Sequence, residues 1–239
     1  MKITFINLIL ITLLMQGFFN KSLAQSDVST EGTSKIGYGA RIGLTSSAFT
    51  NYEDTVFSEF GAGVSISAFG TYQINDMFFV SAELSYINRK AVNINQGIIF
   101  NTESPLFSAE YISESKTNIV LHNIETAIKI NGYLPTGDKN FKPRIFIGNS
   151  LGYIFKANAI TERTYVMDNI ATVSKYNVTE RFKAIDDAFI LGCGADINMD
   201  TFEITVDLDY KFGLCNINNV QGYAPFSSNT LELMVGVKF

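Results

Sequence analysis

Apolar and polar residues alternate along this chain in segments of about ten residues, which is the pattern of a β-strand with two different faces. The clearest segment spans 202–212. Its even positions are Phe202, Ile204, Val206, Leu208, Tyr210 and Phe212, and its odd positions are Glu203, Thr205, Asp207, Asp209 and Lys211. A helix would place these charges all around its axis and leave no apolar face. The segment therefore predicts a strand.

Seven further segments alternate in the same way. They span 35–44, 63–74, 79–89, 119–130, 144–156, 188–198 and 230–239. Several of them place glycine or serine opposite the large apolar residues. Small residues on one parity suit the interior of a narrow barrel, because about eight strands leave room only for side chains.

The predicted connections are alternately long and short. Tight turns are expected at 74–77 and 198–200 and a modest turn at 134–138, whereas the other connections are much longer. Outer-membrane barrels have short periplasmic turns and long outward loops. Because backbone groups in hydrocarbon must all be paired, the sheet has to close. We predict an all-β, eight-stranded, antiparallel up-and-down transmembrane barrel with its first strand beside its last.

Two alternatives to this fold stay open. Ten strands are possible, because 93–100 and 172–179 could extend as strands above the membrane. An exported soluble β-sandwich or a lipocalin-like barrel would also alternate, but with its apolar parity inside and its charges outside.

The first residues have a different pattern. Lys2 precedes an apolar run from Ile3 to Phe19, and small residues at Ser22 and Ala24 follow. This three-part pattern predicts a signal peptide cleaved after Ala24. The expected organisation is a signal peptide over 1–24, a short lead over 25–34 and the barrel over 35–239.

Composition narrows the possible functions. The chain is 46% hydrophobic and 17% charged, which excludes disorder, and after the first twenty residues no run approaches the roughly 20 apolar residues of a membrane helix. The net charge of −5 and the scattered basic residues argue against a nucleic-acid partner. We expect Cys193 and Cys215 to be free thiols, because they fall at different levels of adjacent predicted strands.

The polar parity carries charges that would face one narrow lumen. They are Arg41, Glu83, Arg89, Glu125, Lys129, Arg144, Asp196, Glu203, Asp207, Asp209, Lys211 and Glu232. Buried charges require partners. We predict a network that sets Arg41, Arg144 and Lys129 against Glu83, Glu125, Asp207 and Asp209. The lipid parity carries an aromatic girdle of Tyr38, Tyr72, Phe78, Tyr86, Tyr153, Tyr210, Phe212 and Phe239.

The order and spacing of several pieces resemble the PorT-like outer-membrane β-barrel family of Bacteroidetes. They are the glycine-rich 36–43, then 79–86, 142–148 with 151–153, 192–196, 210–218 and the closing 236–239. The resemblance implies the fold and a Gram-negative outer-membrane location. Members resembling PorT itself are associated with secretion. The terminal Phe239, with Val237 and Val235, is similar to the signal by which the barrel-assembly machinery recognises its clients.

We assign no catalytic, cofactor-binding or metal site from the sequence. His122 is the single histidine, and a lipid-modifying enzyme with Ser85 or a loop serine as its partner is one alternative. A small pore is another, since rings of charge select ions. The first hypothesis is a non-enzymatic structural or protein-interaction barrel. Its partners would be membrane lipid and a protein bound by the outward loops at 103–114, 161–183 and 216–229.

Overall fold

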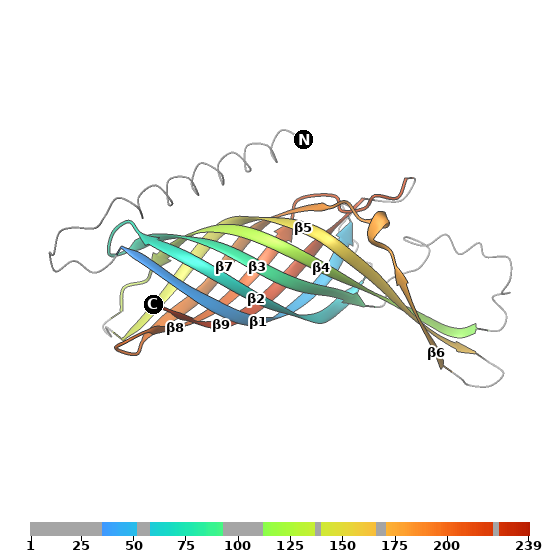
Figure 1. Ribbon diagram of the computed structural model, residues 1–239, viewed down its shortest axis with the longest axis horizontal. Coiled ribbons are helices and arrows are strands. Elements are labelled where there is room, and N and C mark those ends of the chain that lie inside the picture. Colours follow the sequence, from blue (N-terminus) through green and yellow to red (C-terminus); the bar gives the residue numbers. More distant parts are fainter. Residues whose placement is uncertain (1–34, 52–57, 93–111, 137–139, 166–170, 222–224) are drawn as a thin grey trace.

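A computed structural model describes residues 35–51, 58–92, 112–136, 140–165, 171–221 and 225–239. The described residues form one sheet in the order β4-β3-β2-β1-β9-β8-β7-β5-β6, and β4 also pairs with β5 (Figure 1). The strands are β1 (Ile36–Asn51), β2 (Glu59–Gln73), β3 (Phe78–Val92), β4 (Ile112–Tyr133), β5 (Phe141–Tyr165), β6 (Ala171–Asn177), β7 (Ile185–Asn198), β8 (Glu203–Gly213) and β9 (Phe226–Lys238). The β4–β5 pairing closes eight strands into an antiparallel barrel.

The predicted closure and inside–outside assignment are confirmed. The first strand pairs with the last, with Ile42 opposite Val235. Ile42 and Leu44 are 70% and 66% exposed on the outer face, whereas Arg41 and Thr45, which flank this segment, are buried. The reversed arrangement of a soluble barrel is therefore wrong. The predicted girdle residues lie on the outer parity as well, with Tyr38 and Phe239 more than half exposed.

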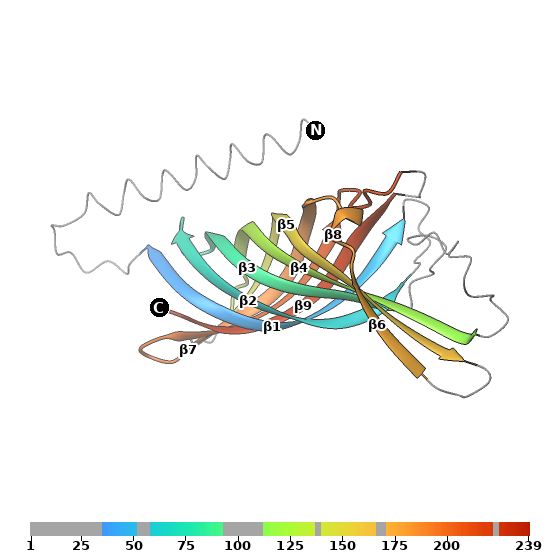
Figure 2. The ribbon, with the colours of Figure 1, turned by 45° about the vertical axis from the view of Figure 1, so that its right-hand side comes forward.

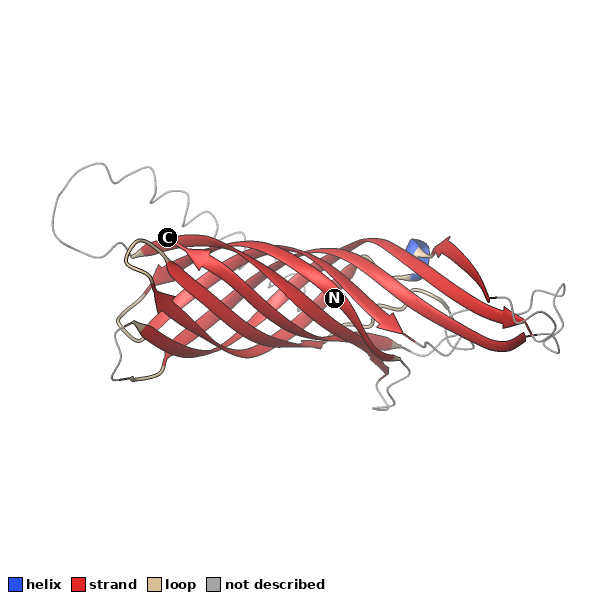
Figure 3. Cartoon of the chain, turned by 90° about the horizontal axis from the view of Figure 1, so that it is seen from below, coloured by secondary structure: helices blue, strands red, loops and turns tan. Residues whose placement is uncertain are grey.

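Two strands are longer than their sequence pattern predicts. β4 has 22 residues and β5 has 25, and beyond the barrel wall they continue as a ribbon. β6 adds to this ribbon by pairing with 158–164 of β5. Figures 2 and 3 show the three strands projecting past the other strand ends. β6 is the extension considered at 172–179; the other, at 93–100, lies outside the described residues, as does the predicted signal peptide.

Inward glycines make room for large lumen side chains. A Cβ atom on Gly192 would lie 2.4 Å from the Phe146 ring, and one on Gly194 would lie 2.1 Å from Oδ1 of Asp207. The barrel is thus narrow enough that a single methyl group collides. Within the described residues, no helix is long and apolar enough to cross a membrane.

The two cysteines are free thiols. Cys193 in β7 faces outward and is exposed, and Cys215 follows the end of β8 and is partly buried.

Candidate functional site

The middle of the lumen is filled by ion pairs. Each buried cation contacts two carboxylates: Arg41 lies 3.5 Å from Glu83 and 3.1 Å from Asp207, and Lys129 lies 3.1 Å from Glu83 and 2.6 Å from Asp209. These side chains are at most 3% exposed. Such doubly paired charges meet the requirement that buried ions be compensated.

The ion pairs join into two alternating chains of charge. The longer one runs from the short-turn end to mid-barrel through Lys142, Glu203, Lys238, Asp196, Arg144, Asp207, Arg41, Glu83, Lys129 and Asp209. The shorter one, nearer the long loops, runs through Glu232, Lys211, Glu125, Arg89 and Asp186. Because they draw on seven of the eight barrel strands, the chains tie the wall together across the lumen.

The predicted network is confirmed for Glu83, Asp207 and Asp209 but wrong for Glu125. Glu125 pairs with Arg89 and Lys211, at 2.5 Å each. It lies two inward positions from Lys129 on β4, about 13 Å along the strand, and so belongs to a different level of the lumen. Asp186, which sequence reasoning did not include, is the second partner of Arg89.

Three inward phenylalanines also contact the cations, and the alternation pattern had not drawn attention to them. The guanidinium of Arg41 lies 3.8 Å from the centroid of the Phe69 ring. Phe146 lies within 5.5 Å of both Lys129 and Arg144, and Phe79 lies near Arg144 and Lys238. Their position on the polar parity of their strands is the sequence signal that could have predicted that they face the lumen.

An apolar cluster closes the lumen at the long-loop end. It comprises Phe49, Ala91, Ile119, Leu121, Ile154, Ala157, Ala159, Val178, Phe182, Ile217 and Phe226. Val178 and Phe182 flank the 3-10 turn Thr179–Arg181, which is held over the opening by backbone hydrogen bonds: the Lys183 N–H donates to Ile217 O at 2.8 Å, and the Asn219 N–H to Arg181 O at 3.0 Å. We call this cluster the plug.

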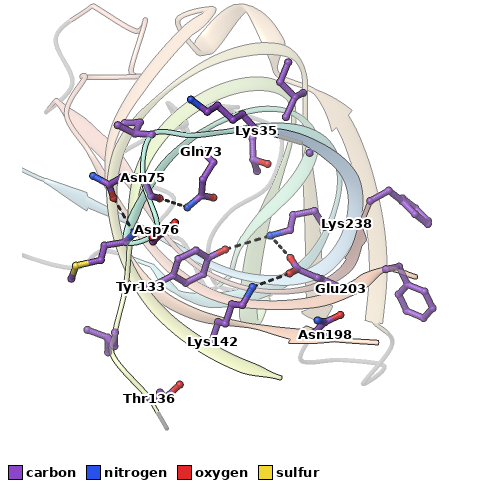
Figure 4. Close-up of a pocket in the computed structure, with 18 of the residues that line it drawn as sticks. Lys35, Gln73, Asn75, Asp76, Tyr133, Thr136, Lys142, Asn198, Glu203 and Lys238 are labelled. Atoms are coloured by element: carbon purple, nitrogen blue, oxygen red, sulfur yellow. Dashed lines mark hydrogen bonds and ion pairs between the residues drawn. The ribbon is translucent and has the colours of Figure 1, made fainter. Parts of the chain in front are cut away.

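A cavity of about 1060 Å³ opens at the short-turn end. Its charged wall is made by Tyr133, Lys142, Glu203 and Lys238 (Figure 4). The Tyr133 hydroxyl donates to Asp196 at 2.8 Å and accepts from Lys238 at 3.4 Å. The cavity therefore ends on the first members of the long ion-pair chain.

His122 does not meet the serine that a catalytic pair would need. The imidazole lies on the outer face of β4, where Nδ1 is 2.8 Å from the Tyr86 hydroxyl and Nε2 is 3.5 Å from the Asn158 amide. Ser85 is buried on the lumen side and donates to Glu83. The wall of the barrel separates the two residues, so the Ser85 pairing is wrong. No group of metal-ligating side chains occurs in the described part of the chain.

The structure describes parts of the three loop regions that were considered for partner binding. Residues 103–111, 166–170 and 222–224 lie outside the described residues, whereas 171–177 form β6, and Val178 and Phe182 belong to the plug. Asn218 and its neighbours in the last loop pair with the plug turn.

A closed barrel with an apolar outside and a charged inside defines the class of transmembrane β-barrel proteins. The family model described as outer membrane protein beta-barrel domain matches residues 23–219, and the chain belongs to that family. It is an outer-membrane protein of Gram-negative bacteria.

Several solved structures are similar to this chain. Neisserial surface protein A is 14% identical, with a TM-score of 0.44, and the match covers 87% of this chain and 98% of that one. OprG of Pseudomonas aeruginosa is 11% identical, with a TM-score of 0.41 and coverage of 88% and 99%. Ail of Yersinia pestis is 11% identical, with a TM-score of 0.36 and coverage of 86% and 99%. No curated protein matches the sequence.

Proposed function

We propose that this protein is a non-enzymatic, non-conducting barrel that presents the β4–β6 ribbon to a protein partner outside the cell. The observation that carries the proposal is the ribbon itself. In the described residues, β6 pairs only with β5, and β3 pairs with β4 only as far as Ile119. Among the described strands, none lies beside the outer edge of β6 from Val173 to Asn177.

An unpaired edge is a template for an added strand. On β6, Val173 is 67% exposed and Tyr176 is 50% exposed, and they point to opposite faces of the ribbon. An extended peptide pairing with β6 would gain main-chain hydrogen bonds and contact one of these side chains on each face.

Crosslinking tests the proposal in the native membrane. A photoreactive amino acid replaces Val173 in one strain and Gln221, also exposed at the long-loop end, in a matched strain. We expect a discrete adduct from position 173, absent from position 221 and abolished by Tyr176→Lys, which blunts the edge with charge. Equal adducts from both positions, or no adduct from either, would contradict the proposal that the ribbon binds the partner.

The filled lumen supports the absence of conduction. Any path must pass both the plug and the ion-pair chains, whose charges are already paired. Planar-bilayer recordings should show no steady unitary conductance. A reproducible open level would favour the alternative of a small pore.

The absence of enzymatic activity is tested through His122. Its position away from Ser85 supports this part of the proposal, and His122→Ala should leave the outer-membrane lipid composition unchanged. A changed acylation pattern would revive the lipid-modifying alternative.

A secretion-associated role is the more specific form that the PorT-like resemblance suggests. In it, the ribbon's partner would be a component of an export machine. Deleting the gene should then retain exported proteins in the periplasm, and the complementing copy with Tyr176→Lys should fail to release them.

We further propose that Phe239 serves the barrel-assembly machinery. It is 59% exposed on the outer face and its ring is 6.0 Å from that of Tyr38. Phe239→Ser should lower the amount of heat-modifiable barrel in the outer membrane, while refolding in detergent is unchanged.

A further inference from the structure

Four basic side chains gather on the outer face at the long-loop end. We call Lys90, His122, Lys156 and Lys175 the basic patch. Strand register places them on four neighbouring strands: His122 of β4 pairs with Lys156 of β5, and Lys90 of β3 is opposite Val120 of β4. Lys175 of β6 is opposite Ile160 of β5, four residues along from Lys156. The charges of Lys156 and Lys175 both act on the His122 imidazole.

The patch lacks the compensation seen in the lumen. Whereas each buried lumen cation contacts two carboxylates, Lys90, Lys156 and Lys175 make no ion pair within the described residues. Glu162 is the exposed acid of β5 nearest to the patch. It is opposite Lys116 of β4 and Val173 of β6, and so faces no residue of the patch directly across the sheet. Like charges held together on a surface attract an anion.

The patch lies where the apolar residues of the outer face end, on the side of the long loops. On β3 every outward residue from Phe78 to Tyr86 is apolar or aromatic, and none is charged. Asn88 and Lys90 are the next outward residues. Those nine residues, at about 3.3 Å each and tilted by about 40°, span roughly 20 Å of membrane. On β4 and β5, Ile124 and Phe155 are the last exposed apolar residues before His122 and Lys156. Lys90, His122 and Lys156 are therefore at the level of lipid headgroups, and Lys175, opposite Ile160, lies about 10 Å farther from the apolar residues.

We propose that the basic patch binds the phosphate groups of a phosphorylated glycolipid in the outer leaflet of the membrane. The long-loop end faces that leaflet. The lysines come from three strands, and β3 and β5 alone are two sheet spacings, about 10 Å, apart. One phosphate cannot contact all of them, so the patch fits a headgroup with more than one phosphate. The acyl chains would lie along the exposed Leu84, Ile124 and Tyr153 below.

The test uses the whole barrel refolded in nanodiscs of phosphatidylcholine doped with diphosphoryl lipid A, the glycolipid probe. Lipid A retained per barrel is measured by native mass spectrometry. The double variant Lys156→Gln/Lys175→Gln is compared with Lys35→Gln/Lys183→Gln, which removes two other exposed lysines, one of them at the same end. We expect about a tenfold loss of retained lipid A in the first variant and wild-type retention in the second. Heat modifiability confirms that both variants fold.

Further measurements with other lipids and with inorganic phosphate identify which phosphate-bearing molecule the patch binds. Monophosphoryl lipid A should be retained less than the diphosphoryl form, phosphatidylglycerol should be retained less than either, and inorganic phosphate should not compete. Equal retention by the two double variants would overturn the site. Displacement by inorganic phosphate, or equal retention of phosphatidylglycerol, would overturn the glycolipid assignment. The proposal does not depend on the strand-adding role of the ribbon, since Tyr176→Lys leaves the patch intact.

Discussion

Arg144 and Asp207 form an ion pair on the inner wall of the barrel, with 2.6 Å between Nη2 and Oδ1, although β7 separates their strands β5 and β8 in the sheet. Both side chains are almost completely buried, and each has a second partner, Asp196 for Arg144 and Arg41 for Asp207. The pair therefore lies at the centre of the long chain of charges.

Replacing Arg144 by Met should lower the free energy of unfolding by about 3 kcal/mol, because it removes one of the two counter-charges of each of two buried carboxylates, leaving Asp207 with Arg41 and Asp196 with Lys238. Urea titration of the barrel in detergent micelles, followed by the fraction that migrates as folded without boiling, measures the effect. Removing the facing carboxylate as well, in Arg144→Met/Asp207→Leu, should recover part of the loss.

The matched control is Lys142→Met. Lys142 pairs with Glu203 at 3.4 Å, but the two side chains are 42% and 21% exposed. Such a pair contributes about 0–1 kcal/mol. An equal loss in both single variants would mean that burial of the ion pairs does not control their energy.

Phe182→Asp should release the plug turn while the barrel stays closed. The ring of Phe182 packs 6.2 Å from that of Phe49 and 6.1 Å from that of Phe226, and a carboxylate cannot be buried there without a partner. Hydrogen exchange at the Lys183 amide should accelerate strongly, since its bond to Ile217 would be lost. Lys183→Asp, at an exposed neighbouring position, should retain slow exchange; if it does not, the turn is held by something other than Phe182.

Gly192→Ala should destabilise the barrel by about 1–3 kcal/mol through overpacking. Its new Cβ would approach the Phe146 ring and the Leu208 carbonyl at 2.4 Å and 2.6 Å. At Gly70 the nearest atom to a new Cβ is 3.9 Å away, so Gly70→Ala should change stability by less than about 1 kcal/mol. Urea titration compares the two, and a reversed order would exclude a crowded lumen as the reason for the inward glycines.

Cys215 should be slow to alkylate in the folded protein. Burial raises the pKa of its thiol, and the negative charges of Asp187 and Asp186 raise it further. Because the thiolate is the nucleophile, the raised pKa lowers the reactive fraction, and the rate should rise with pH through a range above that of an ordinary cysteine. Iodoacetamide labelling of a Cys193→Ser variant, folded and in urea, measures this shift. Identical pH profiles in the two states would show that the environment has no effect.

The sequence determined which residues face lipid and which face the lumen, because side chains alternate strictly along a strand and a closed barrel has only two faces. That rule alone places Ile42 outside and Arg41 inside. It also determined the closure, since long and short connections alternate through eight segments.

The tertiary structure decided which inward residues meet. Glu125 and Lys129 share a face of β4, yet they belong to different levels, and the level of each charge depends on the tilt and register of all the strands. The ribbon, the plug and the basic patch have the same origin. Each of them forms only through pairing between segments that are distant in the sequence. Local periodicity carries no information about that pairing.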